Sequence, residues 1–221
     1  MEHFSGKSTL PLRDSSFKLA VEKEGLPASL SLASFEEVMG CLFLPQLHFA
    51  DPKFLHCVEK KTEKLRKKGE LTRKQLWLGS YYRQEIESGY TPDLFFRWID
   101  EEIGWGVFAA RPFRKGEFIG EYGGVLRKKR RIDRRNSYCF QYAVAEEHPL
   151  PYNIDAREQG GVARWINHSF RPNLLTMLAT FDSVSHILLL AGEAIPRGAQ
   201  LLYDYGADYW ASRKGLRGIL P

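Results

Sequence analysis

The stretch RWINHSFRPN, residues 164–173, decides how this chain of 221 residues is interpreted. Its polar triplet Asn-His-Ser, residues 167–169, stands just ahead of Pro172, which has no backbone N–H and biases Arg171 away from helical angles. A short helical or turn segment should therefore end there, before the apolar residues 174–178. Taken alone, the triplet is typical of a turn, so its meaning depends on the rest of the chain.

Three further stretches give the triplet a context. Residues 104–106 read GWG, residues 121–124 read EYGG and residues 203–206 read YDYG. In this order and at these separations, the four stretches resemble the SET-domain protein lysine methyltransferases, over about residues 93–210. The resemblance implies a mostly β fold with some α-helix, in which small sheets surround a pseudoknot and the segment after Asn167 threads beneath the C-terminal one. Threading of this kind is rare and does not follow from periodicity.

The composition is that of a globular protein. With 43% hydrophobic and 13% aromatic residues, the chain can bury a proper core. Its three cysteines, Cys41, Cys57 and Cys139, form no CxxC pair, which favours neither a disulfide framework nor a zinc cluster and indicates a reducing compartment. The apolar runs are far shorter than the roughly 20 residues that span a bilayer, and the N-terminus has no signal-peptide pattern. We therefore expect a soluble protein with no membrane partner.

Positive charge is concentrated in two runs, although the net charge is only +5. Residues 59–74 carry eight Lys or Arg against three Glu, and residues 127–135 (RKKRRIDRR) carry seven against one Asp. A solvated helix face is the simpler interpretation of the first run. The second run lacks helical apolar spacing, so it is an exposed flap, a patch like a nuclear-localisation signal, or a patch that contacts nucleic acid such as nucleosomal DNA.

The N-terminal part of the chain predicts an extension of the catalytic domain. Ser, Pro and Gly are frequent up to Ser34, so residues 1–33 are predicted to be irregular. A helical extension is predicted over residues 34–92. Its first helix should cover about residues 35–43, with Ser34 as the N-cap. The Thr-Pro pair at 91–92 breaks the helical pattern and is the expected domain boundary.

Two more helices should follow within this extension. Asp51, directly ahead of a proline, predicts the start of a helix that runs to residue 68, where Gly69 supplies a left-handed C-terminal residue. Thr72 and Gln75 form a capping-box pattern for another helix, which Gly89 ends.

Aromatic residues recur at helical spacing in that last helix. Trp77 with Tyr81, and Leu78 with Tyr82, stand four residues apart and so share a helix face. We expect these side chains to pack on the catalytic domain.

From Leu94 onward the pattern changes to short apolar stretches separated by Gly, Pro and charged turns, which predicts a compact, mostly β domain. The SET catalytic domain is expected over residues 93–206. A C-terminal segment, 207–221, with Tyr209, Trp210 and a basic tail at 213–217, is expected to close the site. The predicted strands cover about residues 94–99, 106–110, 117–125, 137–144, 174–181, 186–191 and 200–203.

The SET resemblance implies a site for S-adenosylmethionine. Main-chain groups of four consecutive residues would contact this methyl donor, and the side chains of Asn167 and His168 would contact its adenine and amino-acid parts. Trp210 would stack on adenine, roof the lysine channel or only pack on the fold. Glu158 stands where relatives usually carry an aromatic residue, which puts one cofactor contact in doubt. The four main-chain residues are Ile103, Gly104, Trp105 and Gly106.

The resemblance also implies three tyrosine roles. Tyr205 matches the catalytic tyrosine, Tyr138 matches a tyrosine that lines the lysine channel, and Tyr203 stands where relatives carry either Phe or Tyr. A tyrosine at that position predicts mainly monomethylation. No metal is expected, because His168 has no second His or Cys at ligand spacing. A serine hydrolase is disfavoured as well, since the chain contains no GxSxG.

The expected activity is transfer of a methyl group from S-adenosylmethionine to a protein lysine. Without flanking zinc-binding cysteine clusters, the chain most resembles the small SET proteins of intracellular bacteria, which are delivered into the host and modify histones. That resemblance implies a bacterial cytoplasmic protein with delivery to a host nucleus. Two alternatives stay open: a methyltransferase of a bacterial histone-like protein, and a catalytically idle module that binds chromatin or nucleic acid.

Overall fold

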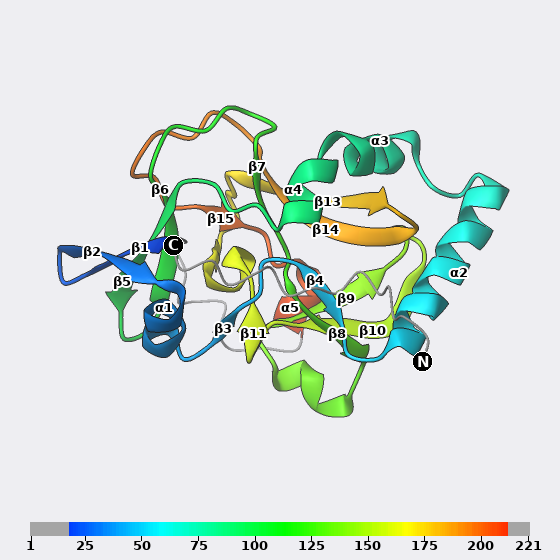
Figure 1. The fold of residues 1–221 in the computed structure, drawn as a ribbon, viewed down its shortest axis with the longest axis horizontal. Coiled ribbons are helices and arrows are strands. Elements are labelled where there is room, and N and C mark those ends of the chain that lie inside the picture. Colours follow the sequence, from blue (N-terminus) through cyan, green and yellow to red (C-terminus); the bar gives the residue numbers. More distant parts are fainter. Residues whose placement is uncertain (1–17, 212–221) are drawn as a thin grey trace, which may run out of the picture.

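The computed structural model describes residues 18–211, which form several small sheets with helices around their edges (Figure 1). Three sheets carry most of the strands, in the orders β2-β1-β5-β6, β4-β8-β10-β9 and β13-β14-β7. Two short parallel pairs, β11-β3 and β12-β15, connect them. Over the described residues, no helix is long and apolar enough to cross a membrane.

The N-terminal segment corrects one prediction. Residues expected to be irregular form a hairpin of β1 (Lys18–Lys23) and β2 (Leu26–Ser31). β1 also pairs in parallel with β5 (Leu94–Asp100), so this hairpin extends a sheet of the catalytic part. Local composition gave no sign of the pairing with β5, because β5 lies more than 70 residues away in the chain.

The first helix begins earlier than predicted. α1 covers Leu32–Met39, and its N-cap is Ser31, whose hydroxyl accepts a hydrogen bond from the Ser34 N–H at 3.3 Å. Ser34 is therefore inside the helix, and the prediction that it caps residues 35–43 was wrong. The helix ends at Gly40, which has a left-handed φ of 60°.

The next helices follow their capping signals. α2 covers Pro52–Lys68, with Asp51 as N-cap and Gly69 in the left-handed region at its end, as predicted. α3 (Arg73–Tyr81) starts after Thr72, whose hydroxyl accepts the Gln75 N–H at 3.1 Å. The predicted single helix then breaks into α3 and α4 (Arg83–Ser88), which ends at Gly89.

Two predictions about side chains of α3 and its flank have different outcomes. Leu78 and Tyr82 are buried in a small core with Phe118 and Leu188, as expected. Trp77 and Tyr81 instead point to solvent, with 56% and 62% of their surfaces exposed. The prediction that this aromatic pair packs on the catalytic domain was wrong.

The remaining strands complete the sheets. β6 (Gly104–Ala109) pairs with β5, and β7 (Phe118–Glu121) pairs with β14 (Val184–Ala191), which continues to β13 (Leu174–Phe181). The predicted strand over 117–125 is interrupted at Tyr122 and Gly123, before β8 begins at Gly124. The other strands of these sheets are β3 (Leu42–Phe43), β4 (Leu47–Phe49), β8 (Gly124–Lys128), β9 (Cys139–Ala143), β10 (Pro149–Asp155) and β11 (Gln159–Gly160).

The stretch that opens the sequence argument lies against the C-terminal strand. After the short 3-10 helix η2 (Val162–Trp165), β12 (Asn167–His168) runs parallel to β15 (Leu202–Tyr203), and α5 (Ala207–Ala211) follows. Asn167 stands opposite Leu202 and His168 opposite Tyr203. The pairing therefore brings the polar triplet and the YDYG stretch together, as the SET resemblance implied.

The N-terminal extension is built into this core. A Cβ at Gly123 would lie 2.1 Å from the Leu44 carbonyl oxygen, so the two backbones touch directly. Phe35 of α1 is fully buried, and its ring centroid lies 5.5 Å from that of Trp165. The hydrophobic core is therefore continuous from the extension into the catalytic part, and the domain boundary at 91–92 stays a prediction.

Candidate active site

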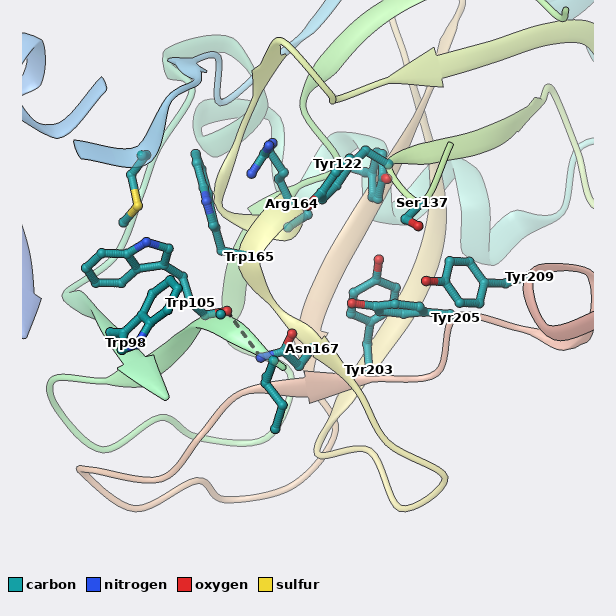
Figure 2. Close-up of a pocket in the computed structure, with 15 residues that line it drawn as sticks. Trp98, Trp105, Tyr122, Ser137, Arg164, Trp165, Asn167, Tyr203, Tyr205 and Tyr209 are labelled. Carbon is teal, nitrogen blue, oxygen red and sulfur yellow. Dashed lines mark hydrogen bonds between the residues drawn. The ribbon is translucent and has the colours of Figure 1, made fainter. Parts of the chain in front are cut away.

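A cavity of about 480 Å³ opens between β6, η2 and the C-terminal strand. Figure 2 shows that its lining has two different ends. Trp98, Trp105 and Trp165 gather at one end, whereas tyrosines gather at the other. Asn167 lies between the two ends, where its side-chain amide donates to the Trp105 carbonyl at 3.3 Å. The tyrosines are Tyr122, Tyr138, Tyr203, Tyr205 and Tyr209.

Three consecutive residues at the start of β6 border the cavity. These are Ile103, Gly104 and Trp105, and Gly104 has a left-handed φ of 76°, which disfavours other residues. Gly106 lies behind the lining: a Cβ there would approach the Ile99 side chain at 2.8 Å and the Asn167 amide nitrogen at 3.2 Å. The two glycines thus serve different needs, one a backbone turn and the other close packing against Asn167.

His168 and Trp210 lie outside the cavity lining and contact each other. Their ring centroids are 4.8 Å apart, and both side chains are buried. His168 Nδ1 accepts the Tyr205 backbone N–H at 3.2 Å, which connects the triplet to the YDYG stretch. Burial lowers the pKa of His168, so the imidazole is neutral at pH 7.

This pair also contains two buried polar atoms without a partner. Among the described residues, neither His168 Nε2 nor Trp210 Nε1 makes a hydrogen bond. Orphaned polar atoms of this kind are rare in native proteins, and each requires an explanation.

The tyrosine end is a cluster of neutral phenols. Tyr205 donates its hydroxyl proton to the Ile166 carbonyl at 2.9 Å, and its ring lies 4.7 Å from those of Tyr203 and Tyr209. Burial, reinforced by the neighbouring phenols, raises the pKa of Tyr122, Tyr203 and Tyr205 well above the ordinary value. At neutral pH these groups therefore orient hydrogen bonds and do not act as anionic bases.

Arg164 presents a cation to the middle of the cavity (Figure 2). Its guanidinium lies 4.2 Å from the Tyr138 ring centroid and 5.1 Å from that of Trp165, and its Nε donates to the Ala156 carbonyl at 2.9 Å. The two terminal nitrogens make no hydrogen bond or ion pair with residues 18–211 in the structure. A held guanidinium with free terminal nitrogens can bind a carboxylate.

The structure corrects the interpretation of Arg127, the first residue of the basic run at 127–135, as an exposed cation. The Arg127 guanidinium is buried between two carboxylates, 2.7 Å from Asp133 and 2.6 Å from Asp155, and its side chain is only 14% exposed. By pairing with both carboxylates, Arg127 holds the short helix η1 (Arg131–Arg135) against β10. Burial opposes ionisation of Asp133, but the hydrogen bond from Arg127 outweighs it and lowers the pKa of this carboxyl. It is therefore a structural residue and not part of a surface patch.

Comparison with known proteins gives a family match for the second half of the chain. The family model of the SET domain matches residues 104–206. This stretch is similar to a SET domain. N-lysine methyltransferase KMT5A of Xenopus tropicalis is 40% identical over 112 residues, which are 47% of this chain and 33% of that protein. Human histone-lysine N-methyltransferase 2D is 33% identical over 113 residues, 48% of this chain and 2% of that protein.

The chain thus spans a third or less of the length of these curated relatives. Among solved structures, that of Arabidopsis thaliana SUVH6 in complex with SAM is 29% identical, with a TM-score of 0.45, and the likeness covers 52% of this chain and 27% of that one.

The structure adds cavity residues that the sequence reasoning did not select. Tyr122 and Arg164 belong to quoted stretches of the SET domain, so their proximity to the motifs was an available signal. Met39 and Trp98 come from outside the SET domain, from α1 and β5, and no motif marks them. Within residues 18–211, no three His, Cys, Asp or Glu side chains are grouped so that they could hold a metal ion. The predicted site closure by the tail at 213–217 lies outside the described residues.

Proposed function

We propose that this chain is a protein lysine N-methyltransferase that uses S-adenosylmethionine. The observation that carries the proposal is the tyrosine cluster of the SET domain, which shares one cavity with Ile103, Gly104 and Trp105 at the start of β6. The names of the relatives support the reaction class. The test is incubation with the methyl-labelled donor and a protein mixture, followed by mass spectrometry; absence of any labelled lysine would contradict the proposal.

The cavity fits the methyl donor in size and in the chemistry of its lining. Sites for ligands of this size enclose about 300–1,000 Å³, and this one encloses about 480 Å³. The backbone of Ile103, Gly104 and Trp105 would hold the donor, with Asn167, while Arg164 would bind its carboxylate. The orphaned Nε2 of His168 would donate one hydrogen bond, because Nδ1 of the neutral ring accepts the Tyr205 N–H. When bound, S-adenosylmethionine supplies a methyl group on a positively charged sulfur.

The tyrosine end would receive the substrate lysine. A lysine with a pKa near 10.4 is protonated at pH 7, and removing its proton costs roughly 4 kcal/mol. An aromatic channel disfavours the ammonium form and so reduces this cost. Because Tyr205 donates its own proton to Ile166, its oxygen is left to accept an N–H of the substrate amine. Tyr205 would therefore orient the neutral amine, and most of the acceleration would come from positioning.

We also propose that the product is mainly monomethyl-lysine. Tyr203 is 5% exposed and lines the cavity beside Tyr205, where its hydroxyl would occupy the space that a methylated amine needs in order to turn. Tyr203→Phe should shift the product toward di- and trimethyl-lysine, with little loss in the first transfer. Mass spectrometry of one peptide methylated by both forms measures this. Efficient trimethylation by the wild type would refute the assignment.

A histone or histone-like protein is the proposed substrate class, since relatives of the SET domain are named histone-lysine methyltransferases. Nucleosomal DNA is a proposed further contact of the exposed cations at 128–131. Neutralising Lys128, Lys129 and Arg130 should lower activity on nucleosomes much more than on a histone-tail peptide, because only nucleosomes offer phosphates. Equal losses on both substrates would contradict the contact. Arg127 is left intact in this test because it holds η1.

The cellular setting stays a prediction. Delivery by an intracellular bacterium into a host nucleus would be tested with a tagged copy followed by microscopy in infected cells. Mass spectrometry of labelled lysines in both bacterial and host lysates would separate a host histone from a bacterial histone-like substrate. A chain that binds chromatin and transfers no methyl group to either lysate would be the catalytically idle alternative.

A further inference from the structure

A pair of large aromatic rings is exposed on α3. Trp77 and Tyr81 stack with their centroids 4.7 Å apart and their planes 22° apart, while 56% and 62% of their surfaces face solvent. The opposite side of the helix already anchors it, through the buried residues Gln75, Leu78 and Gly79. The packing of α3 therefore does not require the exposed rings, and they form a flat apolar surface that is open to a ligand.

This ring pair borders a groove of about 1,090 Å³ between α3 and the loop that precedes β7. Arg114 and Lys115 line it on the loop side. No residue lines both this groove and the catalytic cavity. In Figure 1, α3 lies along the edge of the molecule opposite the short helix at 131–135, so the groove is also separate from the second basic run.

Cations flank the rings from two directions. Arg73 and Lys74, four and three residues before Trp77, share its exposed side of α3, and both are exposed, as are Arg114 and Lys115. None of these four cations makes an ion pair with any residue between 18 and 211 that the structure describes. By contrast, Arg111 in the same groove is paired with Glu117 at 2.6 Å.

The acidic residues of this surface do not balance these cations. Glu117 is already engaged by Arg111, which leaves Glu85 as the other carboxylate that lines the groove. The last turn of α2 carries Arg66, Lys67 and Lys68, of which Arg66 is paired with Glu63 at 3.5 Å and Lys68 with Glu70 at 3.4 Å. The basic run at 59–74, interpreted from sequence as a solvated face, thus ends three residues before Trp77 in the chain.

We propose that this surface binds single-stranded nucleic acid, with bases stacked on Trp77 and Tyr81 and phosphates against the four cations. Every base offers a flat π-face, and grooves that combine aromatic platforms with positive charge bind single strands without strong sequence preference. A duplex hides its base faces, and an acidic peptide has no planar group to use the rings. The combination of both features therefore favours a single strand over either alternative.

The expected contribution of the platform is measurable. Stacking of one base on an aromatic side chain contributes about 1–3 kcal/mol, so Trp77→Ala should weaken binding about 5- to 150-fold. Trp77→Phe keeps a stacking face and should retain most of the affinity. Arg73→Gln with Lys74→Gln should reduce the slope of log K against log salt by about 0.7 for each lost phosphate contact.

The experiment is fluorescence anisotropy with a labelled 12-nucleotide single strand, as DNA and as RNA, and with a duplex of the same sequence. Ile132→Ala is the matched control, because Ile132 is 69% exposed in the other basic run. Thermal melting of each variant verifies folding. The proposal predicts a loss with Trp77→Ala, none with Ile132→Ala, and weaker duplex binding. Unchanged affinity of Trp77→Ala, equal binding of the duplex, or equally effective competition by polyglutamate would overturn it.

Discussion

Replacing Tyr205 by phenylalanine removes a single oxygen atom from the proposed lysine end of the cavity. The ring keeps its contacts, because its centroid lies 4.7 Å from those of Tyr203 and Tyr209 and 5.3 Å from His168. The buried Ile166 carbonyl loses the donor that now lies 2.9 Å away. Leaving such an acceptor unsatisfied costs about 1–3 kcal/mol of unfolding free energy, so a domain of ordinary stability stays folded.

The effect on catalysis should be larger than the effect on stability. Without the hydroxyl, nothing at this position orients the substrate amine, and a misplacement of about 1 Å costs roughly a hundredfold in rate. Affinity for S-adenosylhomocysteine should change by less than about threefold, since the backbone of Ile103, Gly104 and Trp105 is untouched. The assays are methyl transfer to a peptide by mass spectrometry, product binding by calorimetry, and chemical denaturation.

Tyr82→Phe is the matched control for this change. Tyr82 is also a buried tyrosine whose hydroxyl donates to a backbone carbonyl, that of Gly116, but it lies outside the catalytic cavity. It should lose similar stability and keep its rate. If Tyr205→Phe retains more than about a third of the wild-type rate, Tyr205 is a packing residue and the proposed orientation of the amine is wrong.

Three other changes have defined outcomes. Gly79→Ala in α3 would gain up to about 1 kcal/mol from helix propensity, but its Cβ would lie 1.9 Å from the Thr180 carbonyl oxygen, so we expect a lower melting temperature. Arg127→Met leaves buried Asp133 unpaired and should cost about 3–5 kcal/mol in chemical denaturation. Because burial lowers the pKa of His168, the unfolded chain binds its proton more readily. The stability that His168 adds over a His168→Gln variant should therefore be complete above about pH 6.5 and decline as the pH falls below it, measured by denaturation at each pH.

Local signals in the sequence were sufficient for some elements. α2 begins after Asp51 and ends at Gly69 as predicted, because capping depends on hydrogen bonds and backbone angles within a few residues. The four motifs likewise indicated the SET resemblance, because each motif is a short stretch that can be recognised in the sequence. The family model covers all four. Ile103, Gly104 and Trp105 line the cavity for the same reason, since they are consecutive in the chain.

Tertiary structure alone decided which surfaces are covered and which distant residues meet. Periodicity placed Trp77 and Tyr81 on one helix face but carried no information on whether another element covers it. The charge run showed Arg127 only as one cation among seven. It did not reveal the ion pair with Asp155, because Asp155 stands 28 residues away. Met39 reaches the cavity from a helix that no motif marks, because packing joins residues by their distance in space and leaves no pattern in the local sequence.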